Sequence, residues 1–224
     1  MYIAGTERCQ ISVEEPAPLL VALYLRERAG LSPNLGYRLP ALDPPYTSWP
    51  VWARGAPVGW APPVAVQTAP VDPTTAAAEW VRWWNHLLAE GATSSEAFHP
   101  PGFRDLRALP LIQLLLQRHY EEASRWVDAL IEDPRVRRDQ TTPRPGLGRM
   151  LAELEADPSY RPLPFRLRLT IVPVRTKHAW PLDPEHILIS RRLVADTDNV
   201  LDWLRPRVFA LARGRSALRP SHGR

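Results

Sequence analysis

The densest group of polar side chains lies between two apolar runs near the end of the chain. It consists of Arg175, Lys177, His178, Asp183, Glu185 and His186. An imidazole oriented by a carboxylate is a common general acid–base pair, so His178 and Asp183 are a candidate base and its orienting partner. Loops between rigid strands often carry binding groups. The candidate contacts for a small ligand are Lys177, His178, Asp183 and His186. The alternative, which we favour, is a solvated hairpin connection with Trp180 packed over its core.

Two histidine–glutamate pairs have spacings that would place both side chains on one face of a helix. His119 and Glu122 are three residues apart, and Glu79 and His86 are seven apart. A di-metal site in a helix bundle requires Glu-x-x-His on two helices and two further glutamates, and neither pair has this order and spacing. The motifs H-E-x-x-H and C-x-x-C are also missing from the sequence. We therefore expect no metal and no cofactor, and interpret these histidines as surface or hydrogen-bonded residues.

Several reaction classes lack the motif that they need. The single lysine, Lys177, does not follow a glycine at a helix start, which excludes a Walker-type phosphate loop. Gly146 and Gly148 are too few for a dinucleotide fingerprint, and no serine stands in a G-x-S-x-G elbow before the tail. Cys9 has Arg8 beside it but no nearby histidine, so we interpret it as a buried or incidental thiol. We do not exclude an enzymatic activity, but we expect none. We therefore assign no catalytic residue.

Five segments have the apolar spacing and end signals of helices. The first opens at Glu14-Glu15-Pro16, ends before Gly30, and has leucines spaced for one buried face. The others cover 74–91, 103–133, 148–156 and 197–212, with Pro206 expected to bend the last one. On the second helix, a tryptophan stripe at this spacing is typical of a core or an interface.

Strand signals are fewer and gather late in the chain. Residues 165–171 alternate between apolar and polar side chains, residues 186–190 form a second candidate strand, and residues 2–13 alternate loosely. Pro173 indicates that the strand before it ends at or near a sheet edge. We predict a mainly helical α+β fold with three to four substantial helices, a small late β-sheet and an extended arm rich in proline and tryptophan.

The expected organisation is one globular domain over residues 1–212. Ten prolines lie within the 41 residues 33–73, which disfavours regular helix there and predicts an ordered arm. A polyproline segment offered to a partner is the alternative for this arm. Residues 134–147 are expected to form an exposed connection, and residues 213–224 a disordered arginine-rich tail.

The positive charge is concentrated at the end of the chain. The net charge is +4, but six arginines follow the last acid, Asp202, so the remainder carries −2. The candidate nucleic-acid contacts in the tail are Arg213, Arg215 and Arg219. Because the body lacks a basic surface and a recognition motif, we consider nucleic-acid binding improbable.

The expected location is the cytoplasm. No basic-then-apolar signal opens the chain, and the uncharged run 55–71 contains four prolines, which argues against a membrane span. A single cysteine agrees with a reducing compartment.

Nine tryptophans are many for 224 residues, and aromatic side chains are enriched at protein interfaces. We therefore predict a non-enzymatic intracellular interaction protein, an adaptor, accessory or assembly subunit, that binds another protein or itself. The candidate partner contacts are Trp49, Trp52, Trp60, Trp83 and Trp84. The alternatives are a ligand-binding protein or enzyme that uses the 175–186 loop, and a nucleic-acid-associated factor that uses the tail.

Overall fold

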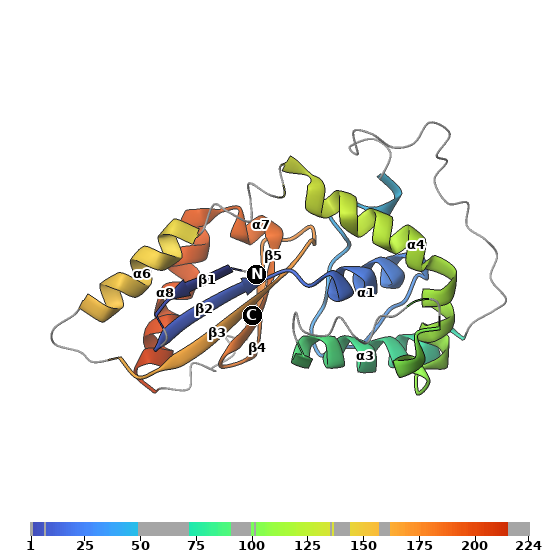
Figure 1. The fold of residues 1–224 in the computed structure, drawn as a ribbon, viewed down its shortest axis with the longest axis horizontal. Helices are drawn as coiled ribbons and strands as arrows, with labels where there is room; N and C mark the ends of the chain where they lie inside the picture. The colour runs from blue at the N-terminus through green and yellow to red at the C-terminus, as the bar shows by residue number, and fades with distance from the viewer. Residues whose placement is uncertain are drawn as a thin grey trace. The chain divides into compact units, whose positions relative to one another are not determined.

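A computed structural model describes residues 2–6, 8–48, 72–90, 100, 102–134, 136, 144–156 and 162–214. The chain divides into two compact units (Figure 1). The sheet unit comprises residues 1–15, 137–172 and 176–224, and the helical unit comprises residues 16–136 and 173–175. In sequence, therefore, the helical unit is an insertion in the sheet unit.

The sheet unit contains a five-stranded mixed sheet in the order β1-β2-β3-β5-β4. The strands are β1 (Tyr2–Gly5), β2 (Cys9–Glu14), β3 (Phe165–Val172), β4 (Ala179–Asp183) and β5 (His186–Ser190). The central strands β2, β3 and β5 are parallel, and each edge strand pairs antiparallel with its neighbour. Parallel neighbours require a long crossover. Between β2 and β3 this crossover contains helix α6 (Arg144–Ala156) and the inserted helical unit.

One face of the sheet carries the core of this unit. The strand register aligns Val13, Leu169 and Ile187 across β2, β3 and β5, so that these side chains share a face. They pack in one cluster with buried residues of α6 and of α8 (Thr197–Ala212) (Figure 1). A short helix, α7 (Arg191–Val194), joins β5 to α8.

Helices α6 and α8 approach each other closely at Gly146. A Cβ atom added there would lie 2.5 Å from Cδ1 of Leu201, closer than non-bonded carbon atoms can lie. Helix α6 begins at Arg144, within the segment expected to be an exposed connection. Gly146, which lies in that segment, thus permits the close packing of two helices.

The helical unit is built around α1 (Ala17–Arg28). The other helices are α3 (Pro73–Glu90) and α4 (Pro110–Glu132), with short 3-10 turns η1 (Tyr46–Ser48) and η3 (Arg104–Leu106). The eight consecutive residues from Leu19 to Arg26 are all buried. The expectation that this helix buries one face was therefore wrong. Its run PLLVALYL is apolar around the whole circumference, and such a helix needs cover on every side.

Tryptophans of α3 attach that helix to α1. The indole Nε1 of Trp80 donates a hydrogen bond to the backbone carbonyl of Ala22, at 2.7 Å. Trp80 also stacks on Trp84, with ring centroids 5.0 Å apart, and Trp84 Nε1 donates to the Tyr37 hydroxyl. The stripe thus supplies apolar area, and the indole N–H groups of Trp80 and Trp84 are satisfied.

A carboxylate of α3 caps the start of α4. Glu79 is 4% exposed, and its Oε2 accepts the backbone N–H groups of Leu111 and Ile112 at 2.8 and 3.1 Å. These N–H groups belong to the first turn of α4, where no carbonyl of the same helix can accept them. A negative charge is also favourable at the positive end of the helix dipole. Glu79 therefore joins the two helices.

The predicted fold class, a mainly helical α+β fold, is confirmed. The sheet, however, takes two of its five strands from the N-terminus. Strand β3 is central rather than at an edge, and Pro173 follows its last residue, so no ladder hydrogen bond is lost. None of the helices in the described part of the chain is long and apolar enough to cross a membrane.

Helix α8 covers the predicted residues 197–212, and α1 ends before Gly30 as predicted. The described part of the arm, residues 33–48, contains no α-helix. Residues 49–71 of the arm, 137–143 of the connection and 215–224 of the tail lie outside the described residues.

Replacing Glu79 by alanine should lower the free energy of unfolding by about 1–3 kcal/mol, because two buried N–H groups lose their acceptor. Urea unfolding of the full chain measures this change. Glu121→Ala, a fully solvated carboxylate on α4, is the control and should change stability by less than about 0.5 kcal/mol. Equal stability of the two variants would show that the cap contributes nothing.

Candidate functional site

A groove lies on the helical unit, in the described part of the chain. Its volume is about 690 Å³, and it lies between α3 and the loop that follows α1. The lining residues are Gly30, Ser32, Asn34, Pro73, Thr74, Ala77, Ala78 and Val81. None of these eight carries an ionisable side chain, and most of the lining surface is apolar. The groove thus offers shape and apolar contact rather than acid–base groups.

The wall on the α1 side begins with a Schellman motif. Gly30 has φ +62°, a conformation that glycine adopts without strain. Its N–H donates to the carbonyl of Glu27, and the N–H of Leu31 donates to that of Arg26. This closed turn sets the direction of the loop that lines the groove.

The α3 wall is held by its N-terminal cap. The two carboxylate oxygens of Asp72 accept the backbone N–H groups of Thr74 and Thr75, at 3.2 and 3.1 Å. The Thr75 hydroxyl also donates to Asp72, and this hydrogen bond, followed by the two backbone ones, lowers the pKa of Asp72. Because these hydrogen bonds involve the first turn, they position Pro73 and Thr74 at the groove.

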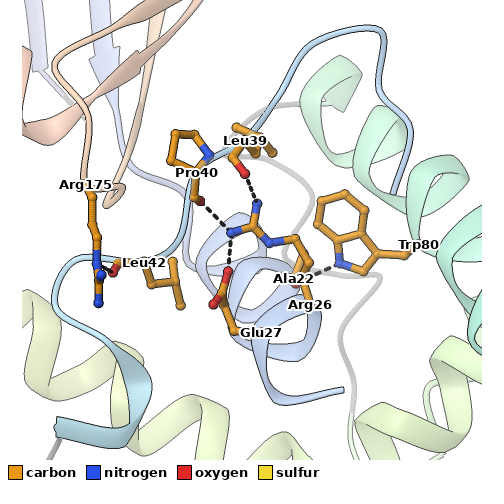
Figure 2. Close-up of polar contacts among 8 residues, drawn as sticks. All are labelled: Ala22, Arg26, Glu27, Leu39, Pro40, Leu42, Trp80 and Arg175. Atoms are coloured by element: carbon orange, nitrogen blue, oxygen red, sulfur yellow. Dashed lines mark hydrogen bonds and ion pairs between the residues drawn. The ribbon is translucent and has the colours of Figure 1, made fainter. Parts of the chain in front are cut away.

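Arg26 fixes the far end of the same loop, as Figure 2 shows. Its side chain is buried, and its guanidinium donates to the carbonyl of Leu39 at 3.3 Å and of Pro40 at 2.7 Å. It also forms an ion pair with Glu27, at 2.5 Å. A buried guanidinium needs such partners because it has lost its water.

Beyond Pro40 the loop is tied to residues 173–175. The backbone N–H of Asp43 donates to the carbonyl of Pro173, and that of Arg175 donates to Ala41. Arg175 Nε also donates to the carbonyl of Leu42, at 3.3 Å (Figure 2). The loop after α1 is thus held by hydrogen bonds at several points.

A second, smaller hollow of about 250 Å³ adjoins the groove at Ser32, which lines both. Its lining is mostly polar and comprises Arg26, Glu27, Leu31, Ser32, Pro33, Leu35, Arg38 and Leu39. The Arg26–Glu27 pair is internally neutral. Arg38 is exposed and has no hydrogen-bond or ion-pair partner among the described residues. Among the residues that the structure describes, this pocket therefore carries one positive charge without a counter-charge.

The 175–186 segment does not assemble into one site. It forms the β4–β5 hairpin, in which Asp183 pairs with His186 at the turn. His178 lies at the opposite end, where its backbone N–H donates to Ser190. Five extended residues span about 15 Å, beyond hydrogen-bond reach. The hairpin therefore does not bring His178 and Asp183 together as a base and its orienting partner.

Three of these polar residues have structural partners. Lys177 forms an ion pair with Asp196, at 2.6 Å, just before α8. Asp183 accepts the backbone N–H of Glu185 and so closes the hairpin turn. The exposed ring of His178 packs against Trp180 in a T-shaped contact. This geometry agrees with the alternative of a hairpin connection covered by Trp180.

His186 belongs to a buried hydrogen-bonded chain that crosses three strands. Arg168 lies 3.0 Å from its Nδ1, and the hydroxyl of Thr170 lies 2.9 Å from its Nε2. Arginine only donates, so Nδ1 accepts, and the neutral ring then donates from Nε2. The Thr170 hydroxyl in turn donates to Glu14. Both nitrogens of His186 are thus used within the protein.

Burial, followed by the nearby Arg168 guanidinium, lowers the pKa of His186 to about 4, while the charge of Asp183 opposes this shift. The ring is therefore neutral near pH 7. His186 lines neither the groove nor the smaller hollow described above.

The two histidine–glutamate pairs differ in their contacts: one stays together and the other does not. His119 Nδ1 lies 3.3 Å from Glu122, whose carboxylate also accepts the hydroxyl of Tyr24 at 3.2 Å. Burial and the Arg28 charge lower the pKa of His119. Glu79, in contrast, caps α4, and His86 pairs with Glu90 on the surface. Within the described residues no three potential ligands gather around a metal position.

The tryptophans of α3 are core residues. Trp83 and Trp84 are 1% and 0% exposed, so the expectation that they contact a partner does not fit their burial. Their helical spacing places them on the side of α3 that also carries Glu79 and Trp80, which contact α4 and α1. Trp49, Trp52 and Trp60 lie outside the described residues, and their role stays a prediction.

The remaining sequence candidates are Cys9 and the arginines of the tail. Cys9 is buried, and burial, followed by the charge of Glu155, raises the pKa of its thiol, which disfavours the nucleophilic thiolate. Arg213 follows the last residue of α8 and is exposed, whereas Arg215 and Arg219 lie outside the described residues.

Sequence reasoning missed the groove and the adjoining pocket. The alanines and Val81 on the solvent side of α3 look like ordinary helix residues, and Arg38 is one arginine among 27. Of the residues that line this region, only Gly30 was recognised in the sequence, as the residue that follows the end of α1.

No family model matches the chain, and neither a curated protein nor a solved structure matches it.

Stability should fall as the pH drops from about 6.5, the ordinary histidine pKa, toward 4. In this window the unfolded chain binds a proton at His186 that the folded chain does not, so His186 contributes up to about 3 kcal/mol of this loss. Melting temperatures of wild type and His186→Gln across this range test the effect, and the variant should have the shallower slope. His178→Gln, at the exposed end of the hairpin, should keep the wild-type slope. Identical slopes for all three would contradict the assignment.

Arg26→Met should destabilise the chain by about 2–4 kcal/mol, because it leaves two carbonyls and the Glu27 carboxylate without their donor. Hydrogen exchange of the backbone amides of 30–40 should also accelerate. Arg38→Met removes an exposed guanidinium from the same loop and serves as the control, with a change below about 0.5 kcal/mol. Unchanged exchange in Arg26→Met would exclude Arg26 as the anchor of the loop.

Proposed function

We propose that this protein is a non-enzymatic intracellular interaction protein, an adaptor, accessory or assembly subunit. The observation that supports this proposal is the 690 Å³ groove between α3 and the loop after α1. Its lining provides apolar surface and two short alanine side chains, which let the backbone of a bound segment approach closely. Ala77 and Ala78 are four and three residues before Val81, so they face the groove from the same side of α3.

The groove is suited to binding because its walls are held before a partner arrives. Arg26 and the Schellman turn hold one wall, while the Asp72 cap and the Trp80 hydrogen bond hold the other. Preorganised walls reduce the conformational entropy that association costs. A groove that holds its shape and lacks ionisable lining residues favours recognition of a protein segment over catalysis.

A location in the cytoplasm belongs to the same proposal. Cys9 is a free buried thiol, which is usual for proteins of reducing compartments. The partner is a protein chain, either a different protein or a second copy.

Ala78→Glu places a charge in the groove at an exposed helical position and should abolish partner binding without lowering the melting temperature. The measurement is affinity capture by the full chain from its native host, with mass spectrometry of retained proteins and light scattering of the purified chain. Ala89→Glu, the same substitution at an exposed position outside the groove on the same helix, is the matched control.

A protein retained by wild type and Ala89→Glu but lost from Ala78→Glu supports the proposal, as does self-association with the same pattern. Equal retention by all three chains, or retention of nothing by a monomeric wild type, would overturn it.

A further inference from the structure

We infer that the groove and the adjoining Arg38 pocket together bind one segment of a partner protein, in which apolar residues are followed by an acidic side chain. This inference rests on the proposed function and specifies the chemistry of the partner. Because Ser32 lines both hollows, a bound chain that fills the groove reaches the pocket without leaving the surface.

The two hollows differ in polarity. Apolar surface predominates in the groove, whereas polar surface predominates in the pocket. A ligand that satisfies both must therefore change from apolar to polar along its length. A protein segment has this property, since successive side chains enter successive subsites.

The sign of the polar group follows from the charges that line the pocket. The carboxylate of Glu27 is held by Arg26 Nη2, at 2.5 Å, and the same guanidinium also donates to the carbonyls of Leu39 and Pro40. Arg38 is the remaining charge, and it has no partner among the described residues. A planar guanidinium with free donors matches a carboxylate in shape and charge.

The pocket also selects against a basic side chain. A lysine or arginine of the partner would face Arg38 and would have to displace Arg26 in order to reach Glu27. Like-charge contact lowers the affinity for wrong partners, so Arg38 contributes specificity as well as attraction.

The experiment uses a phage-displayed library of random dodecapeptides selected on the immobilised full chain. Four chains are compared: wild type, Ala78→Glu, Arg38→Glu and Arg118→Glu. Arg118 is an exposed arginine of α4 outside both hollows, so its variant has the net charge of Arg38→Glu and is the matched control. Melting temperatures establish that all four chains are folded.

The expected result is that wild type and Arg118→Glu enrich peptides with apolar residues followed by Asp or Glu. Arg38→Glu should retain the apolar residues but enrich Lys or Arg at the acidic position. A synthetic peptide of the wild-type consensus should bind Arg38→Gln about two- to fivefold more weakly than wild type in fluorescence anisotropy, the range for an exposed ion pair.

The two proposals fail in different ways. If wild type enriches no peptides other than those that Ala78→Glu also enriches, the groove is not a docking site. Both proposals then fail. If wild type enriches apolar peptides without an acidic preference, or if Arg38→Glu selects the same peptides as wild type, only the acidic partner is refuted. A wild-type dimer that Ala78→Glu separates would also refute it, because a second copy would then occupy the groove.

Discussion

The helical unit depends on the satisfaction of one buried guanidinium. Helix α1 is apolar on all sides and is buried up to Arg26, so this charge lies where water cannot solvate it. Its side chain holds the carbonyls of Leu39 and Pro40, and its own backbone carbonyl accepts the N–H of Leu31. One residue thereby fixes both ends of the loop that forms a wall of the groove and most of the pocket. The contacts that satisfy the buried end of α1 thus also form the candidate docking surface.

Helix α3 connects the core to this surface through its two sides. One side carries the tryptophans, whose stacking and hydrogen bonds attach it to α1, and Glu79, which caps α4. The other side carries Ala77, Ala78 and Val81 at the groove. Because the large aromatic side chains fix the position of the helix, small residues on the opposite side can form a wall that keeps its shape. The tryptophans thus support binding indirectly, from the core.

In the sheet unit, residues with catalytic potential serve the fold. His186 completes a hydrogen-bonded chain with Arg168 and Thr170, Asp183 closes a turn, and Lys177 pairs with Asp196. A dense polar segment between two strands has the same composition whether it binds a ligand or closes a hairpin. The distinguishing quantity is the distance between the side chains, and the strand register sets it.

The sequence by itself determined the local elements. Gly30 ends α1, apolar spacing marks α8, and alternation marks β3, because caps and periodicity act over a few residues. Only the tertiary structure decided that Cys9 pairs beside Phe165 in a parallel sheet. It alone also decided that Glu79 caps another helix, and that Ser32 joins an apolar groove to the pocket lined by Arg38. These contacts join segments far apart in the chain, and their energies depend on packing that no local pattern records.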